Sequence, residues 1–162
     1  LVHGLALASG LGGMVGGQIL DLGAEGRFDG GVPLKIDEAG IRRLQSMKTG
    51  ALLRFSCEAG ALHAGADATA LARVSRYGDL IGLAFQLADE LLDVEGSAEA
   101  VGKAVGKDAA LGKATIVGLN GVPWARAALK DLVDEALTLF PATDPRTAPL
   151  AAAARFIAER TH

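Results

Sequence analysis

The chain has 162 residues, half of them hydrophobic (50%) and only 4% aromatic, with a formal net charge of −3. This length suits one domain with a real core, so we expect a single domain over residues 1–162. The charge excludes the basic surfaces typical of nucleic-acid binding and of anchoring to anionic membranes. The single cysteine, Cys57, excludes an internal disulfide and is typical of a cytoplasmic protein. Abundant Ala and Leu predict an all-α fold.

Residues 1–22 form the first predicted helix, although six glycines interrupt it, at positions 4, 10, 12, 13, 16 and 17. Each helical glycine costs about 1 kcal/mol relative to Ala, so this number indicates close packing against a neighbouring backbone. A dinucleotide-binding loop is a weaker alternative, because its third glycine would fall at Val15 and no βαβ pattern follows. Gln18, Asp21 and Glu25 give this helix a polar stripe.

The chain has no initiator Met, and its first residues already belong to an apolar periodic run. This beginning predicts that the sequence is part of a longer protein and starts inside a helix. The uncharged stretch 4–17 is too short and too rich in glycine for a membrane span, and no cationic segment marks a signal peptide. We therefore expect no membrane span.

The second helix is predicted over about 38–65, with Asp37 as its N-cap. Lys48, Thr49 and Gly50 interrupt its apolar face with a cation, a hydroxyl and a residue that lacks a side chain. A glycine in mid-helix indicates either a kink or the close approach of another group. A solvated lysine beside a tolerated glycine is the alternative.

The third helix, capped by Asp67 or Thr69 and extending to about Glu95, carries the main functional signal. Its polar residues Gln86, Asp89, Glu90 and Asp93 fall within one arc of about 100°, and most of the remaining circumference is apolar. A helix that is apolar on most sides is packed on most sides, so the acidic arc should face an internal cleft. Charges in such a place need partners, and cations are the obvious ones.

A loop is predicted from Gly96 to about Thr115, with lysines at 103, 107 and 113. After an acidic helix, such a loop is a candidate cationic flap; the alternative is an ordinary surface loop. A fourth helix follows over about 116–140, with Pro123 at a bend or in a fresh first turn. A linker at 141–149 and a last helix over about 148–160 complete the chain.

Asp89 and Asp93, one helical turn apart, offer two hard oxygen ligands on one face, with Glu90 beside them. Mg²⁺ is usually held by one or two carboxylates together with phosphates and water. The sequence contains no His or Cys cluster suited to zinc. Lys48, Lys103 and Lys113 are natural counter-charges for a polyanion bridged to that metal, and apolar walls suit a hydrocarbon tail. A plain helical bundle with a solvated acidic stripe explains the same residues and stays open.

The sequence also resembles the trans-polyprenyl diphosphate synthases, and most closely the bacterial farnesyl and geranylgeranyl diphosphate synthases. Four motifs carry the resemblance in the family's order: Gly13-Met14 to Gln18 with Asp21, Glu25 and Gly26; Lys48-Thr49-Gly50 with Arg54; Gly82 with Phe85-Gln86, Asp89-Glu90 and Asp93-Val94; and Gly102-Lys103 with Gly106, Asp108, Gly112-Lys113 and Thr115. They cover nearly the whole chain and correspond to the C-terminal half of that family.

The resemblance implies the C-terminal half of an all-α isoprenoid-synthase helical bundle, homodimeric as the full-length protein, around a deep cavity. It implies Mg²⁺-assisted ionisation of an allylic diphosphate, attack by isopentenyl diphosphate and loss of a proton. The implied roles are Mg²⁺ binding by Asp89 and Asp93, diphosphate binding by Lys48, Lys103 and Lys113, stabilisation of the allylic cation by Thr49 and Gln86, and lining of the cavity by Gln18 and Asp21.

The sequence departs from the family's pattern in two ways. Glu90 replaces the middle acid of the usual Asp-Asp-x-x-Asp, so its role as a direct metal ligand stays open. The first aspartate-rich motif, its arginine pair and the isopentenyl-diphosphate residues are absent from these residues, so we expect the chain alone to be inactive. Alternatives are a geranylgeranyl diphosphate synthase, a non-catalytic subunit of the same fold, and a terpene cyclase or squalene-synthase-like relative, against which Lys48-Thr49 and the lysine loop argue.

Overall fold

The structure is a computed structural model that describes residues 1–99, 115–140 and 143–160. These ranges are helical and contain no strand, which confirms the all-α class. Along the chain the elements are α1 (Val2–Ser9), α2 (Met14–Ala24), the 3₁₀ turn η1 (Asp29–Gly31), α3 (Glu38–Gln45), the π-helical turn η2 (Ser46–Gly50), α4 (Ala51–His63), α5 (Ala68–Glu99), α7 (Ile116–Asn120), α8 (Val122–Leu139) and α9 (Ala148–Glu159).

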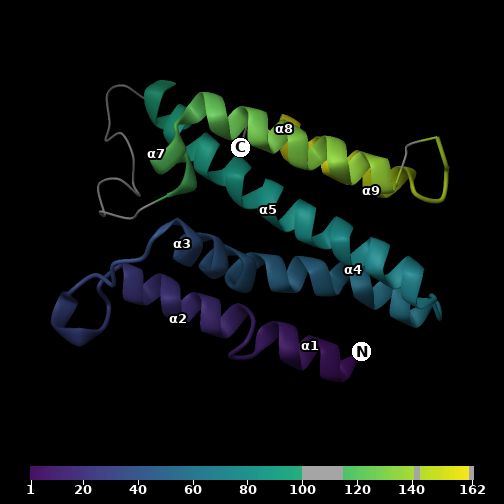
Figure 1. The fold of residues 1–162 in the computed structure, drawn as a ribbon, viewed down its shortest axis with the longest axis horizontal. Helices are drawn as coiled ribbons and strands as arrows, with labels where there is room; N and C mark the ends of the chain where they lie inside the picture. Colours follow the sequence, from purple (N-terminus) through teal and green to yellow (C-terminus); the bar gives the residue numbers. More distant parts are fainter. Residues whose placement is uncertain (100–114, 141–142, 161–162) are drawn as a thin grey trace.

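The 32-residue helix α5 is the centre of the fold. It lies between α3–α4 on one side and α8–α9 on the other, and α1–α2 form the next row beyond α4 (Figure 1). Leu80 and Ala84 of α5 are fully inaccessible, and Tyr77 is 2% exposed. Most of the buried side chains of the core outside α5 come from α8 and α9: Ala125, Leu129, Val133, Ala136, Ala154 and Ile157. The helix predicted to be packed on most sides is therefore the core helix.

Glycines mark the places where two backbones come together. A Cβ added at Gly17 of α2 would lie 2.3 Å from the backbone nitrogen of Lys48 in η2. A Cβ at Gly82 of α5 would lie 3.0 Å from the Cα of Gly50. Both contacts leave no room for a side chain, so the glycines let α2 and α5 approach the η2 turn from two sides. The Gly50 backbone therefore lies against α5, although a Cβ added at Gly50 itself would meet nothing closer than 3.7 Å.

The prediction of one helix over residues 1–22 is wrong in one respect. The helix breaks between α1 and α2, where Gly10 ends α1 in an extended conformation and Gly13 precedes α2. The Gly13 amide donates to the Gly10 carbonyl at 3.0 Å, forming a short turn. Glycine leaves the helical region at little steric cost, so the cluster of three glycines allows this break.

The other helix boundaries follow from local signals. Asp37 caps α3 by accepting a hydrogen bond from the Gly40 amide at 2.8 Å, as predicted. Asp67, and not Thr69, accepts the corresponding bond at the start of α5, from the Ala70 amide. The predicted helix over 116–140 is divided at Gly121, whose φ of 84° ends α7, and Pro123 lies in the first turn of α8.

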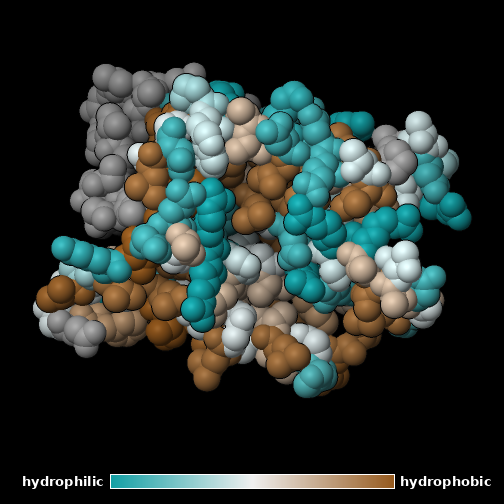
Figure 2. All heavy atoms as spheres, viewed as in Figure 1, coloured by the Kyte–Doolittle hydropathy of each residue, from teal (hydrophilic) through white to brown (hydrophobic). Residues whose placement is uncertain are grey.

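An apolar surface is left along α1 and α2. Figure 2 shows hydrophobic side chains along the lower edge of the molecule, where these helices lie in Figure 1. Leu5, Leu7, Leu11, Val15 and Ile19 are all at least 42% exposed. By length and composition, Val2–Ala24 could cross a membrane, but core helices of soluble proteins meet the same test.

Candidate functional site

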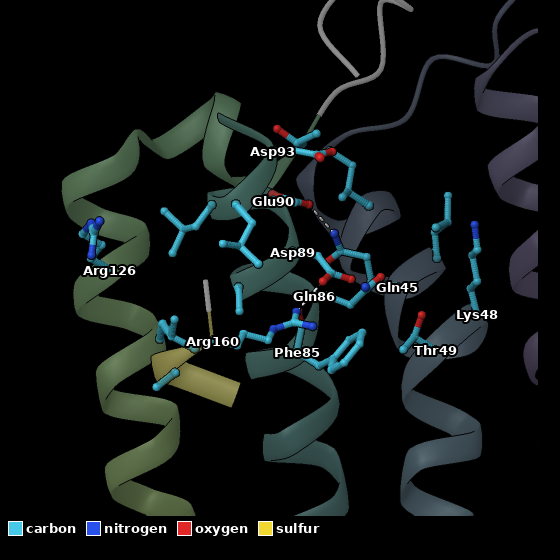
Figure 3. Close-up of a pocket in the computed structure, with 18 of the residues that line it drawn as sticks. Gln45, Lys48, Thr49, Phe85, Gln86, Asp89, Glu90, Asp93, Arg126 and Arg160 are labelled. Atoms are coloured by element: carbon cyan, nitrogen blue, oxygen red, sulfur yellow. Dashed lines mark hydrogen bonds and ion pairs between the residues drawn. The ribbon is translucent and has the colours of Figure 1, made fainter. Parts of the chain in front are cut away.

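The acidic arc of α5 faces a cavity of about 2000 Å³. Gln86, Asp89, Glu90 and Asp93 all line it, and Figure 3 shows them along one side of the helix. The predicted orientation of this arc, toward a cleft and away from the packed faces, is confirmed. The cavity wall is otherwise rich in apolar groups: Ile36, Ile41, Leu44, Phe85, Ala88, Leu91, Leu92, Leu129, Val133 and Leu137.

The opposite wall carries Lys48 and Thr49 on the π-helical turn η2 (Figure 3). A single π turn inside a helix is a rare local structure that often marks a functional site, because it changes the direction in which the side chains point. The interruption seen in the sequence at Lys48-Thr49-Gly50 is this turn. The close packing of Gly17 and Gly82 on its backbone fixes its position.

Lys48 is held by Asp21 of α2. Its ammonium donates to the Asp21 carboxylate, which is 2% exposed, while the Lys48 side chain keeps 34% of its surface accessible. The sequence indicated both residues as members of the site but gave no sign of their pairing. Asp21 thus fixes the ammonium group of Lys48, and both residues line the cavity. Gln18 is not among the lining residues of the described cavity.

Arg160, directly after α9, is the member of the site that sequence reasoning missed. Its guanidinium donates to Asp89 and, at 3.0 Å, to the carbonyl of Phe85, and its central carbon lies 4.1 Å from the centre of the Phe85 ring. The side chain is only 11% exposed. The contact joins residues 71 positions apart, and no periodicity within either helix indicates it.

Glu90 has a different environment from its two neighbours in the arc. Its Oε1 accepts from the Gln45 side-chain amide at 2.5 Å and its Oε2 accepts from the Val117 backbone amide at 2.8 Å. Asp89 accepts a hydrogen bond from the guanidinium of Arg160, and Asp93 is exposed. The carboxylates of Asp89 and Glu90, although adjacent in the motif, therefore have different partners.

Further charges that sequence reasoning did not single out line the side of the cavity formed by α8 and α9. Arg126 of α8 pairs with Glu95 at 2.6 Å, and Lys130 pairs with Asp134 at 2.5 Å. The hydrogen bond to Asp134 raises the pKa of Lys130. Lys103 and Lys113, the other predicted cations, lie outside the described residues.

The chemistry of the acidic arc fits a cation. Asp89 already pairs with the guanidinium of Arg160, so a metal ion would have to share or displace that guanidinium at the Asp89 carboxylate. Within the described ranges, no group of three or more His, Cys, Asp and Glu residues gathers into a complete metal cage. Asp89 and Asp93 could supply one or two hard oxygen ligands, and a Mg²⁺ ion bound there would need phosphate or water oxygens for the rest.

The chain is similar to known proteins over most of its length. The chain is 44% identical to the farnesyl diphosphate synthase of Escherichia coli (strain K12) over 137 residues, which cover 84% of the chain and 44% of that protein. It is 39% identical to the geranylgeranyl diphosphate synthase of Cyanophora paradoxa over 150 residues, covering 93% and 48%. The crystal structure of an FPP/GFPP synthase from Zymomonas mobilis matches with a TM-score of 0.78 and 37% identity, over 96% of this chain and 49% of that one.

The chain thus spans about half the length of the relatives that it matches. The polyprenyl synthetase family matches residues 6–146, which include the η2 turn and the acidic arc of α5. The chain therefore belongs to the polyprenyl synthetase family.

Proposed function

We propose that this chain provides the Mg²⁺–diphosphate side of a short-chain prenyltransferase of the farnesyl diphosphate synthase type. The reaction would join an allylic diphosphate to isopentenyl diphosphate. One observation carries the proposal: the carboxylates of α5 and the Lys48-Thr49 turn line the same cavity, whose walls are otherwise largely apolar. The similarity to farnesyl and geranylgeranyl diphosphate synthases supports it.

Each end of the proposed substrate has matching chemistry in the cavity. Asp89 and Asp93 would hold Mg²⁺, which when bound would neutralise the diphosphate and favour its departure. Lys48 would bind the same diphosphate, together with Lys103 and Lys113. The apolar wall, which includes Leu129 and Val133, would receive the hydrocarbon tail, because such a tail loses its contact with water there.

Thr49 and Gln86 would stabilise the allylic cation that forms when the diphosphate leaves. Both line the cavity, on η2 and α5 respectively. The backbone carbonyl of Thr49 and the side-chain oxygen of Gln86 are fixed dipoles, and fixed dipoles stabilise a developing charge most strongly where water is excluded. Neither group is a base, so their role would be electrostatic.

Lys48 reaches the cavity while its ammonium is paired with Asp21. This pairing limits the rotamers of a side chain that is otherwise among the most flexible, and so lowers the entropy cost of binding a diphosphate. Asp21 would therefore orient Lys48, and it would not contact the substrate itself.

A geranylgeranyl diphosphate synthase is the second candidate, favoured by the relative from Cyanophora paradoxa. The two candidates share the same chemistry and differ in the chain length of the product.

The exposed apolar surface of α1 and α2 supports assembly as a homodimer. We also propose that the protein is cytoplasmic.

The test is prenyl transfer by the complete gene product, with Mg²⁺, an allylic diphosphate and isopentenyl diphosphate. Asp89→Ala should lower turnover by more than the roughly 10- to 100-fold that is typical when a residue supporting a metal ligand is lost. Asp79→Ala is the matched control, because Asp79 lies on the same helix and pairs with Arg54 at 3.6 Å, away from the cavity lining. Equal losses in both variants would reject the assignment. The 162-residue chain alone should give no elongation, and measurable elongation would show that it is sufficient.

A further inference from the structure

Glu90 joins three segments of the chain through one carboxylate. Gln45, at the end of α3, donates its side-chain amide to Oε1 at 2.5 Å. Val117, in the first turn of α7, donates its backbone amide to Oε2 at 2.8 Å. The two donors are 45 residues before Glu90 and 27 residues after it. Figure 3 shows the first of these bonds crossing from α5 to the neighbouring helix.

Both donors adjoin residues that line the cavity. Gln45 directly precedes the π-helical turn with Lys48 and Thr49. Val117 follows Thr115, a lining residue whose hydroxyl caps α7 by accepting from the Gly118 amide at 2.9 Å. The carboxylate of Glu90 therefore sets the spacing between the η2 wall, the acidic arc and the start of α7.

The Val117 amide needs such an acceptor. The first amides of a helix have no carbonyl partner within the helix, and a five-residue helix is too short to be stable without outside contacts. Thr115 satisfies one of these amides and Glu90 satisfies another. The start of α7 is thus fixed partly by a residue of the metal-binding motif.

We propose that Glu90 is a positioning residue, whose carboxylate holds the Lys48-Thr49 turn and the start of α7 in register with Asp89 and Asp93, and that it is not a metal ligand. The proposal rests on the proposed function only for the identity of the site that is positioned. It also gives a physical reason for glutamate at this place: aspartate is shorter by one carbon–carbon bond, about 1.5 Å, and could not keep both bonds.

Two substitutions separate the reach of the side chain from its charge. Glu90→Gln keeps the length, and its amide oxygen can accept from Val117 while its NH₂ group meets the carbonyl of a flipped Gln45 amide. Glu90→Asp keeps the charge and loses the reach. A metal ligand would tolerate Asp at least as well as Gln, whereas a positioning residue would tolerate Gln better than Asp.

The first measurement is amide hydrogen exchange of the segment that contains Val117, in the 162-residue chain without metal. Exchange should be about tenfold faster in Glu90→Asp and Glu90→Ala than in the unsubstituted chain, and close to the unsubstituted rate in Glu90→Gln. Unchanged exchange in Glu90→Ala would overturn the proposal. This readout needs neither metal nor substrate, so its outcome is independent of the proposed function.

The second measurement is binding of Mn²⁺ with inorganic pyrophosphate to the complete gene product. Glu90→Gln should stay within about threefold of the unsubstituted affinity, while Glu90→Asp and the control Asp93→Asn should each lose about tenfold. Loss in Glu90→Gln equal to that in Asp93→Asn would identify Glu90 as a ligand and overturn the proposal. Equal affinity in all Glu90 variants would show a structural role alone and would also overturn it. If the unsubstituted protein binds no Mn²⁺, the proposed function fails, and the exchange experiment still decides whether Glu90 holds α7.

Discussion

Helices α5 and α1–α2 are both apolar and both contain glycine, yet they occupy opposite environments. The middle of α5 is buried, with Leu80 and Ala84 inaccessible, and its polar residues face the cavity. No residue of α1 is buried, and α2 buries only Gly17 and Asp21 while Val15 and Ile19 are exposed. Apolar composition therefore does not determine burial here; the neighbouring helices do. An apolar face without a neighbour is where we expect this chain to associate.

The comparison is tested most strongly by truncating one leucine in each region. Leu80→Ala in α5 should lower the free energy of unfolding by about 2–5 kcal/mol, because it opens a cavity in a closed core. Leu7→Ala in α1, where the side chain is 63% exposed, should change it by less than about 0.5 kcal/mol. Denaturant titration measures both. Similar losses at protein concentrations too low for association would mean that Leu7 is packed within the single chain, which would contradict its exposed position.

A glycine substitution tests whether α2 is fixed on the η2 turn. Gly17→Ala should cost about 1–3 kcal/mol, because the added Cβ would meet the Lys48 backbone nitrogen at 2.3 Å. Gly12→Ala is the control, since a Cβ there meets nothing within 4 Å. Thermal unfolding of both variants measures the difference, and a neutral Gly17→Ala would show that α2 does not pack on Lys48.

These stability tests concern features that the sequence indicated to different degrees. The caps Asp37 and Asp67 and the polar arc of α5 could be predicted, because each depends on residues within one or two helical turns. The pairing of Arg160 with Asp89 could not, because it depends on how α9 docks on α5. The two hydrogen bonds of Glu90 likewise depend on how α3 and α7 pack against α5, and helical periodicity does not predict that packing.

Tyr77 tests the packing of α9 against α5 with a smaller effect. Its hydroxyl donates to the Leu150 carbonyl at 2.7 Å, so Tyr77→Phe should cost about 1 kcal/mol at neutral pH. Burial, with a smaller contribution from Cys57, raises the pKa of Tyr77 to about 12. An unfolded tyrosine titrates near pH 10, so the stability from this group should be complete below about pH 10 and decline as pH rises toward 12.

Tyr77 is the sole tyrosine, so ultraviolet difference absorbance reports its ionisation directly. The Tyr77→Phe variant should lose this part of the alkaline dependence of stability. Ionisation near pH 10 in the folded chain would contradict the buried position of the hydroxyl.

Association through α1 and α2 should appear with the smallest change in stability. The 162-residue chain should show a scattering mass above that of a monomer that rises with concentration. Leu7→Ser combined with Leu11→Ser should reduce this mass while the free energy of unfolding changes by no more than about 1 kcal/mol. A clean monomer at all concentrations would contradict the assignment of this surface.

The acidic arc of α5 is proposed to hold a divalent cation together with a diphosphate. Calorimetric titration of the complete gene product with inorganic pyrophosphate, with and without Mg²⁺, tests it most directly. We expect binding that requires Mg²⁺ and that weakens by about 10- to 100-fold in Asp89→Asn. Binding of equal strength in Asp89→Asn, or binding that does not depend on Mg²⁺, would contradict the claim.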